Sequence, residues 1–352
     1  MLEAQINDRI SLIMNILFFS RLYYPHIGGV EKHVAKIGKI LIQRGHKVTV
    51  VTEKHSHSLK NKEIIEGVEV IRIPAFKEGK NKKFKIWRWL WGNTQLIENA
   101  DIVHCHDVFF WYLPFRFLYP FKKVFTTFHG YEDFPLKPKD VFMHKVSEKL
   151  SMGNICIGDF IPKWYGTKPD FVSYGAVDLP KNEKLSANTG SAVFIGRLDE
   201  QTGILTYIQA VDIIRKKILN FDFLIVGDGK YKNKINKKNR TLKAVGNAAK
   251  YFQDYEYAFV SRYLSILEAI SAKRLVFAVY DNPIKEDYLR LAPFSKQIVI
   301  FNSPSELSSK LLYYRNHPKA KEKMIEKGYL WVQKQTWEKM VKTYLKLWAK
   351  SL

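Results

Sequence analysis

The chain has 352 residues, enough for two ordinary domains that each bury a hydrophobic core. Hydrophobic residues make up 46% and aromatic residues 14%, which excludes a disordered chain and indicates a globular protein. The 57 basic and 34 acidic residues give a net charge of +23, which favours anionic partners: a negatively charged membrane face, nucleic acid or phosphorylated substrates. Charge alone does not choose between these partners.

Cysteine content and apolar runs indicate the compartment. Cys105 and Cys156 lie in apolar runs without metal or redox spacing, so we expect reduced, buried thiols and a cytoplasmic protein. No apolar run reaches the roughly 18 residues that a membrane span requires, and the amino terminus lacks the residue order of a signal peptide. We therefore expect a soluble protein or one peripheral to the inner face of the membrane. Residues 1–13 are treated as an extension without an assigned role.

From Asn15 onward, apolar strand-like runs alternate with helix-compatible segments, which predicts a parallel sheet covered on both faces. The expected elements of the first half are a helix at about 30–44 and strands at 16–20, 47–52, 68–73, 101–107, 124–130, 154–157 and 170–178. Residues 179–190 are rich in Pro, Lys, Asn, Ser and Thr and predict a linker. The alternation then restarts with strands at 192–198, 221–229 and 241–245, so we expect a second domain and a cleft.

The first loop places Gly28 and Gly29 immediately before a helix. Paired glycines permit close backbone approach to a ligand, and a helix amino terminus favours an anion. A flexible turn explains the same pair equally well.

Residues 77–96 combine six basic residues with three tryptophans. Such a mixture suits an anionic membrane interface, where indole rings insert at headgroup depth. The expected contacts are Lys80, Lys82, Lys83, Lys85, Trp87, Trp89 and Trp91. Two alternatives stay open: a helix that packs on the sheet behind a solvated basic segment, and a site for single-stranded nucleic acid.

Three histidines lie at or near the ends of expected strands. Ligands of open α/β sheets bind outside the carboxyl ends of the strands, where His106 and His129 would emerge. The spacing of His104 and His106 would suit a metal, but no third ligand is convincing, so we expect hydrogen-bonded structural roles for both. His129 is followed by Gly130, which lets a ligand approach, and it is the better functional candidate.

The stretch from Tyr257 to Val279 predicts a strand, a loop, a helix and a second strand. The loop would feed the helix amino terminus and could hold a phosphate. Glu268 follows Ser265 by three residues, close enough to accept hydrogen bonds from hydroxyl groups attached to that phosphate. A capping box of Ser265 and Glu268 is the structural alternative.

The order and spacing of several weak motifs resemble a GT-B glycosyltransferase of the large retaining family GT4, over nearly the whole chain from Met14. The matching segments are Pro25–Glu31, Val103–His106, His129–Gly130, Tyr174–Asp178, Gly196–Leu198, Val226–Gly229, Leu267–Ala269 and Trp337–Lys339.

The resemblance implies two Rossmann-like domains that face a central cleft. It predicts an acceptor domain at 14–180, a nucleotide-sugar domain at 181–330, and a closing helix at 331–352 that crosses back to the first domain. It also implies transfer of a hexose from a donor such as UDP- or GDP-hexose to a glycan or lipid-linked hydroxyl, with retention of configuration.

The resemblance also assigns site residues. Gly29 would offer an amide to the donor diphosphate, with Gly28 beside it, and Arg197 would balance its charge. Glu268 would hold the ribose, and the amides around Ser265, Ile266 and Leu267 would hold the phosphates, with Gly227 in the same donor-binding set. His129 would lie near the transferred sugar as the catalytic residue. No metal and no cofactor are expected, because a basic site can replace Mg²⁺.

Two positions depart from the family pattern. Thr202 stands where the family usually has lysine, and Val260 stands where the first of two glutamates is expected. Lys273 or Arg262 could supply the missing charge. These departures leave two further hypotheses beside a working transferase: a degenerate GT-B protein that binds a nucleotide sugar or a partner without turnover, and a protein that binds or modifies nucleic acid.

Overall fold

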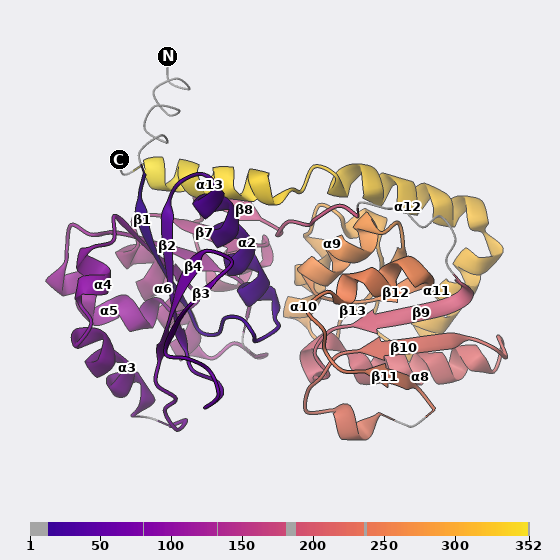
Figure 1. Cartoon of the computed structure of the whole chain (residues 1–352). Helices are drawn as coiled ribbons and strands as arrows, with labels where there is room; N and C mark the ends of the chain where they lie inside the picture. Colours follow the sequence, from indigo (N-terminus) through magenta and orange to yellow (C-terminus); the bar gives the residue numbers. More distant parts are fainter. Residues whose placement is uncertain (1–12, 80, 132, 181–187, 236–237, 351–352) are drawn as a thin grey trace, which may run out of the picture. The chain divides into compact units, whose positions relative to one another are not determined.

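The chain divides into two α/β units, which are described separately (Figure 1). The computed structural model describes residues 13–79, 81–131, 133–180, 188–235 and 238–350. Unit 1 contains the described residues up to Ser173 and those from Trp337 onward, and unit 2 contains Tyr174–Thr336. Lys80, most of the amino-terminal extension and residues 181–187 of the expected linker lie outside the described residues.

Unit 1 is an eight-stranded sheet with helices between the strands. Its elements are β1 (Asn15–Ser20), α2 (Gly29–Gln43), β2 (Lys47–Glu53), β3 (Lys62–Ile65), β4 (Val68–Ile73), α3 (Lys82–Trp91), α4 (Gln95–Glu98), β5 (Ile102–His106), α5 (Phe109–Leu118), β6 (Lys123–Phe128), α6 (Pro138–Leu150), β7 (Asn154–Ile157), α7 (Phe160–Tyr165), β8 (Phe171–Ser173) and α13 (Trp337–Ala349). The strand order is β3-β4-β2-β1-β5-β6-β7-β8, and every pairing except β3 with β4 is parallel.

The central strands of unit 1 are buried along nearly their whole length, as expected for a parallel sheet with covered faces. One strand was not predicted. β3 pairs antiparallel with β4 through a tight turn in which Glu66 and Gly67 both have positive φ. Asn-Gly is the pair usually found in that conformation, so the Glu-Gly pair does not predict a hairpin from the sequence.

Unit 2 is a six-stranded parallel sheet in the order β11-β10-β9-β12-β13-β14. Its elements are β9 (Asn188–Ile195), α8 (Ile204–Arg215), β10 (Asp222–Val226), β11 (Arg240–Leu242), β12 (Tyr255–Phe259), α9 (Tyr263–Ser271), β13 (Leu275–Val279), α10 (Pro283–Arg290), β14 (Val299–Phe301), α11 (Pro304–Asn316) and α12 (Pro318–Val332), with short 3₁₀ turns at Glu200–Thr202, Lys232–Lys234, Ala248–Asp254 and Ser295–Gln297. The expected linker at 179–190 is too long, because β9 already begins at Asn188, where it pairs with β12.

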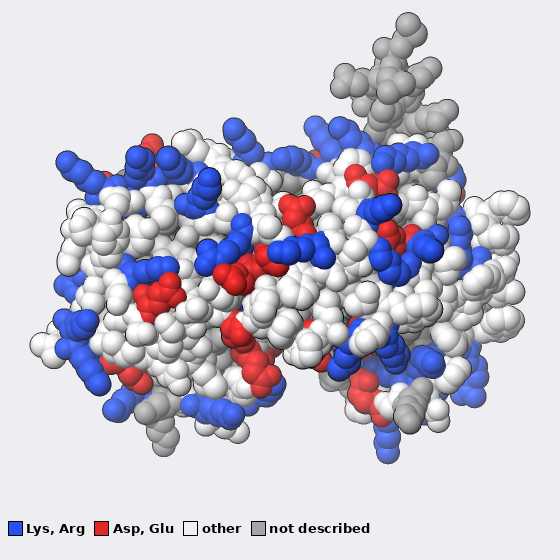
Figure 2. All heavy atoms as spheres, turned by 180° about the vertical axis from the view of Figure 1, so that it is seen from behind, with Lys and Arg blue, Asp and Glu red and all other residues white. Residues whose placement is uncertain are grey.

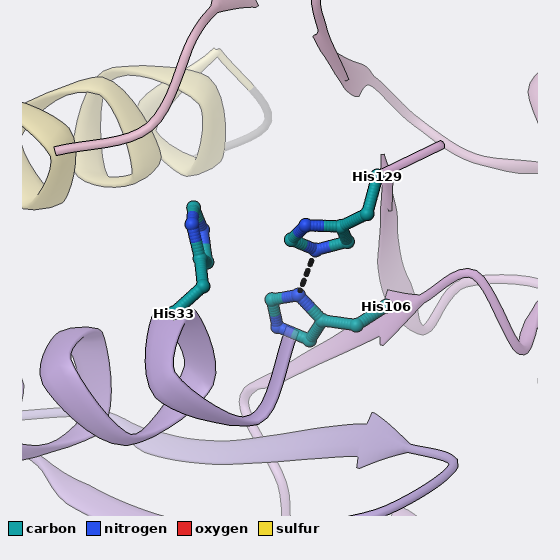
Figure 3. Close-up of side chains that lie close together, drawn as sticks. All are labelled: His33, His106 and His129. Carbon is teal, nitrogen blue, oxygen red and sulfur yellow. Dashed lines mark hydrogen bonds between the residues drawn. The ribbon is translucent and has the colours of Figure 1, made fainter. Parts of the chain in front are cut away.

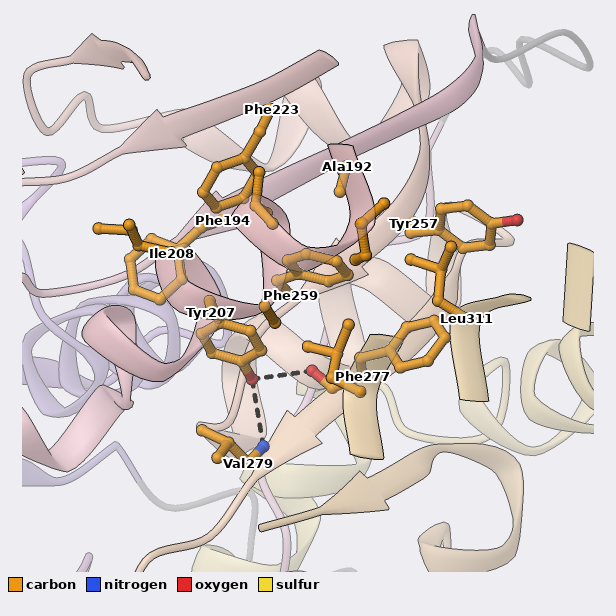
Figure 4. Packing of buried hydrophobic residues seen from close by; sticks show 14 of the residues in the cluster. Ala192, Phe194, Tyr207, Ile208, Phe223, Tyr257, Phe259, Phe277, Val279 and Leu311 are labelled. Carbon is orange, nitrogen blue, oxygen red and sulfur yellow. Dashed lines mark hydrogen bonds between the residues drawn. The ribbon is translucent and has the colours of Figure 1, made fainter. Parts of the chain in front are cut away.

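The core of unit 2 is packed with aromatic rings (Figure 4). Tyr207 of α8 stacks on Phe259 of β12, with ring centroids 5.3 Å apart. The buried Tyr207 hydroxyl donates to the Phe277 carbonyl at 2.8 Å and accepts from the Val279 amide at 3.2 Å. A buried polar group with both partners stabilises a single arrangement of the core.

The last helix, α13, belongs to unit 1, where it lies against α2. Arg44 at the end of α2 pairs with Glu338 of α13 at 2.5 Å, and α13 buries Trp337, Tyr344 and Trp348. The described helices include none with the length and apolar character needed to cross a bilayer.

Candidate functional site

The glycine loop of unit 1 leads directly into α2. Gly28 is the N-cap residue, with an extended backbone, and a Cβ there would lie 2.2 Å from Glu31 Oε2. Glu31 is buried, and its Oε1 lies 2.9 Å from His26 Nδ1. Within the described ranges, the amide of Gly29 has no recorded acceptor, as is usual for the first residue of a helix. The expected contact of Gly28 and Gly29 with a diphosphate stays a prediction.

His129 lies in a cluster of three histidines (Figure 3). His33 projects from α2, while His106 and His129 come from the carboxyl ends of the neighbouring strands β5 and β6. His106 Nδ1 and His129 Nε2 are 3.0 Å apart, and the rings of His33 and His129 meet edge to face at 4.7 Å. His33 was not predicted from the sequence, where its only signal is its place on the inward face of the helix after the glycines.

A chain of hydrogen bonds runs from α13 to His33. Trp348 Nε1 donates to His104 Nδ1 at 3.0 Å, and His104 Nε2 lies 2.7 Å from Thr127 Oγ1. Thr127 Oγ1 lies 2.8 Å from the Tyr344 hydroxyl, which lies 2.9 Å from His33 Nε2. His104 thus has the hydrogen-bonded role expected of it.

The chain of hydrogen bonds has a direction. Because an indole can only donate, His104 Nδ1 accepts, and neutral His104 must donate from Nε2 to Thr127. Every member is satisfied only if Thr127 donates to Tyr344 and Tyr344 donates to His33 Nε2. Neutral His33 then carries its proton on Nδ1.

Burial keeps these imidazoles neutral. Burial lowers the pKa of His33 to about 3. Burial also lowers the pKa of His104, His106 and His129 well below the ordinary value, with neighbouring histidines contributing to each. A neutral His129 can donate or accept a hydrogen bond to a sugar hydroxyl, but it carries no charge for a phosphate.

Three neutral imidazoles could also hold a metal, since one nitrogen from each of His33, His106 and His129 lies within 4.8 Å of the others. Two of these residues already bond directly to each other, and this group of described residues contains no carboxylate to offset a buried dication. We therefore assign the cluster to hydrogen bonding.

Asp107 fixes the loop that carries His129. It follows β5 with a left-handed φ of 62°, and its Oδ1 accepts from the His129 amide at 2.8 Å. A non-glycine residue in this conformation is uncommon outside turns and functional sites. In the sequence, the signal that could have identified Asp107 is its position directly after His106, at the end of the strand.

In unit 2, two arginines meet at one amide oxygen. Arg197 Nη2 lies 3.3 Å from Gln201 Oε1, and Arg262 also donates to that oxygen. Arg197 follows β9 and Arg262 follows β12, which are adjacent parallel strands, so both side chains start from the same edge of the sheet. Asp199 lies 3.3 Å from Arg197 Nε. The expectation that Arg262 compensates for the departures from the family pattern stays a prediction.

Thr202 has a structural role that a lysine could not fill. Its hydroxyl lies 2.7 Å from the Arg197 carbonyl and 2.9 Å from the Asp199 carbonyl, and its own carbonyl accepts from Ser261 Oγ at 3.0 Å. The side chain is buried. Thr202 therefore ties the Arg197 loop to the loop that precedes α9.

Gly227 is required by close backbone packing. A Cβ there would lie 2.0 Å from the Gly196 carbonyl oxygen, and the Gly227 amide donates to the Leu242 carbonyl at 3.0 Å. Any contact of Gly227 with a donor stays a prediction.

The backbone amides available at the start of α9 differ from those predicted to bind phosphate. The helix begins at Tyr263, so Ser265 lies inside its first turn and caps nothing, and the alternative of a capping box is wrong. The Ile266 amide already donates to the Arg262 carbonyl at 2.9 Å, and Leu267 lies further inside the helix. The first-turn amides that can face a ligand are therefore those of Leu264 and Ser265, because the Tyr263 amide donates to the Tyr288 hydroxyl at 2.7 Å.

Glu268 and Lys273 have different positions on α9. Glu268 lies half-buried in the second turn, and its ribose contact stays a prediction. Lys273 follows the carboxyl end of the helix, with its Nζ 4.4 Å from the Tyr329 ring. A helix of nine residues is about 13 Å long, so Lys273 cannot supply charge at the amino terminus. That expectation is wrong.

The basic, tryptophan-rich segment forms α3, and only part of the expected membrane set is exposed. Lys82 is paired with Glu53 at 2.5 Å and Glu78 at 2.7 Å. Trp87 donates to the Phe110 carbonyl at 2.8 Å, and Trp89 packs against the core of unit 1. Lys82, Trp87 and Trp89 are therefore partly buried and engaged with the rest of unit 1, and their contact with a bilayer stays a prediction. The exposed members are Lys83, Lys85 and Trp91.

Further apolar side chains are exposed in the same part of unit 1. They belong to α3, to α5 and to the turn after α5, and comprise Phe84, Trp91, Phe117, Leu118 and Phe121. Phe121 is 94% exposed. On the face seen in Figure 2, lysine and arginine side chains are interleaved with acidic ones.

Three comparisons identify similar proteins. Residues 27–157 match the family model described as Glycosyltransferase Family 4. An uncharacterized glycosyltransferase of Methanocaldococcus jannaschii is 23% identical over 94% of this chain and 96% of its own length. A human protein, one of the subunits of phosphatidylinositol N-acetylglucosaminyltransferase, is 37% identical over 60 residues, which are 17% of this chain and 12% of that protein.

The fold is shared with a crystal structure of a glycosyltransferase from Rickettsia africae, at a TM-score of 0.70 and 16% identity over 96% of this chain and 98% of that one. The expected fold of two parallel-sheet domains is confirmed. Together, the partial family match and the fold make the chain similar to GT-B glycosyltransferases of family 4.

Proposed function

We propose that this glycosyltransferase transfers a hexose from a nucleotide sugar, such as UDP- or GDP-hexose, to a hydroxyl group of a glycan or lipid-linked acceptor. The transfer retains the anomeric configuration. The observation that carries the proposal is the meeting of Arg197 and Arg262 at Gln201 beside the first turn of α9.

This arrangement suits a leaving diphosphate. Two guanidinium groups meet at one neutral oxygen, and the Asp199 carboxylate lies beside one of them, so a bound anion would further lower the repulsion between the two. The amides of Leu264 and Ser265 add donors at the positive end of the helix dipole. Negative charge builds on the diphosphate in the transition state, so these groups favour transfer more than they favour donor binding. For that reason we propose that no metal and no cofactor are required.

On the acceptor side, His129 lies near the transferred sugar. Its neutral imidazole supports a hydrogen-bonding role toward a sugar hydroxyl rather than a role as a cation. In the retaining mode the departing diphosphate can itself take the acceptor proton, so Val260 in place of a glutamate is tolerated.

A lipid-linked acceptor and an anionic membrane surface are the proposed partners. The name of the human relative, which includes phosphatidylinositol N-acetylglucosaminyltransferase, supports a lipid acceptor. The exposed rings of Trp91, Phe117 and Phe121 with Lys83 and Lys85 nearby support contact with anionic lipid.

The test is binding of UDP, GDP and ADP sugars by calorimetry to the intact protein and to Arg197→Met and Arg262→Met. Each arginine supplies a charge-assisted hydrogen bond, so each variant should bind about ten- to hundredfold more weakly, equivalent to about 1.5–3 kcal/mol. Arg290→Met is the matched control, because Arg290 is exposed and pairs with Glu286 on α10. Equal affinities for all four proteins would refute the site.

The second candidate is a protein that binds a nucleotide sugar without turnover, favoured by Thr202 in place of a lysine. Donor hydrolysis separates the two. A working transferase releases free nucleoside diphosphate slowly even without an acceptor, whereas a degenerate one binds the donor and leaves it intact.

A further inference from the structure

Lys285 is a buried lysine next to the proposed donor site. It is 1% exposed and lies in the first turn of α10, where its amide donates to the side chain of the N-cap residue Asn282 at 2.9 Å. Its Nζ donates to the Ser261 carbonyl and lies 4.3 Å from the Tyr288 ring centroid. Lysine is almost never fully buried without a paired carboxylate. No salt-bridge partner of Lys285 occurs among the described residues.

The charges around Lys285 come from three neighbouring segments. The loop before α9 contributes Arg262, the loop after β9 contributes Arg197 and Asp199, and Asp281 precedes α10. On its own helix Lys285 faces Tyr288, whose ring stacks on Tyr263 of α9. Two arginines and two aspartates leave no net negative charge for a buried ammonium.

The ordinary consequence of such burial is loss of the proton. Burial lowers the pKa of Lys285 well below its usual range, with Arg262 contributing in the same direction and Asp281 opposing it. A neutral amine still holds the Ser261 carbonyl through one N–H. It would regain a proton only if negative charge arrived nearby.

We propose that Lys285 is a proton-linked cation of the donor site: it positions the Ser261–Arg262 loop, and it takes up a proton from solvent when a diphosphate binds to Arg197 and Arg262. This inference rests on the proposed function and deepens it. The added charge offsets the cation that Thr202 does not provide. The protein groups of the site, counted without the diphosphate, therefore carry less positive charge when the site is empty than when it is filled.

Proton uptake by Lys285 sets the direction in which diphosphate affinity changes with pH. Because the complex holds one more proton on Lys285 than the free protein, diphosphate affinity falls as pH rises, by up to about tenfold per pH unit for one full proton. The fall is confined to the window between the lowered pKa of the free protein and the higher pKa of the complex. Above that window the amine is neutral in both states.

The experiment compares wild type, Lys285→Met and Lys285→Gln. Calorimetry with UDP, GDP and ADP in buffers of different ionisation enthalpy gives the protons taken up per ligand bound. Lys285→Met removes both the charge and the hydrogen bond to Ser261, and Lys285→Gln keeps a donor without a titrating group. Lys217→Met, at an exposed position beyond α8, is the control for loss of a surface charge.

Both Lys285 variants should take up fewer protons than wild type and the control, and their affinities should approach that of wild type at high pH. Subtracting the proton uptake of the variants from that of wild type removes the contribution from titration of the diphosphate itself. Equal proton uptake and equal pH slopes in wild type and both variants would overturn the proposal and make Lys285 purely structural. If Lys285→Met does not fold, Lys285→Gln decides alone. Failure of wild type to bind any of the three diphosphates would instead overturn the proposed function, and this inference with it.

Discussion

Tyr344→Phe tests the hydrogen-bond chain that connects α13 with the histidine cluster. The Tyr344 side chain is fully buried, and its hydroxyl bonds to Thr127 at 2.8 Å and to His33 at 2.9 Å. Phenylalanine fills the same space, so the change removes two hydrogen bonds without creating a cavity. The Thr127 hydroxyl and His33 Nε2 are then left without these partners.

The magnitude follows from the two bonds that are lost. His33 Nε2 is left without a partner, which costs about 1–3 kcal/mol, whereas Thr127 keeps its bond to His104 and loses one hydrogen bond worth about 0.5–1.5 kcal/mol, so the variant should lose about 1.5–4.5 kcal/mol. At about 2–4 °C per kcal/mol for a domain of this size, the melting temperature of unit 1 should fall by at least about 3 °C. Calorimetric melting is the measurement. Tyr119→Phe is the control, because the Tyr119 hydroxyl bonds to the exposed Glu98 at 2.5 Å and should contribute no more than about 1 kcal/mol.

The direction of the hydrogen-bond chain is tested separately. Nitrogen-15 spectra of wild type should show His33 as the tautomer protonated on Nδ1, because Tyr344 donates to Nε2. A proton on His33 Nε2 would refute the derived direction. A melting temperature for Tyr344→Phe equal to that of Tyr119→Phe would refute the energetic reasoning.

The remaining predictions concern pH, packing, membrane contact and stereochemistry. Folding lowers the pKa of His33 from 6.5 to about 3, and the pKa values of His104, His106 and His129 shift in the same direction. Stability should therefore be lost as pH falls from about 6.5 toward 3, by up to about 1.4 kcal/mol per pH unit for each histidine. A melting temperature that stays constant across this pH window would contradict the prediction. Gly227→Ala should destabilise unit 2 by about 1–3 kcal/mol because its Cβ meets the Gly196 carbonyl, whereas Gly246→Ala, with nothing within 4 Å, should leave thermal unfolding unchanged. Flotation with vesicles should require anionic lipid, weaken with salt, and decrease in a variant with Trp91→Ala and Phe121→Ala; indifference to lipid charge would rule out the membrane proposal. The anomeric proton coupling of freshly made product should report retention; an inverted product would make His129 a general base, and its replacement should then abolish turnover while leaving nucleotide affinity intact.

The class of fold follows from the sequence pattern alone. Alternation of apolar strands with helices is a local pattern, and it placed the described strands of both sheets within a few residues, apart from β3 and β14. The segment from Tyr257 to Val279 was predicted as strand, loop, helix and strand, which the structure confirms. The motifs near Arg197 and His129 lie at the carboxyl ends of parallel strands, and that position also follows from local pattern.

Which of these residues come into contact depends on how the distant segments pack. His33 and Tyr344 are 311 residues apart, and they touch only because α13 packs on α2. Arg262 reaches Gln201 because β12 pairs with β9, a choice of neighbour that no local periodicity encodes. Lys285 looks like a solvent-facing residue of a short polar helix, yet the fold buries it against Ser261. Charge and burial at such positions depend on the atoms around them, and those atoms come from distant parts of the chain.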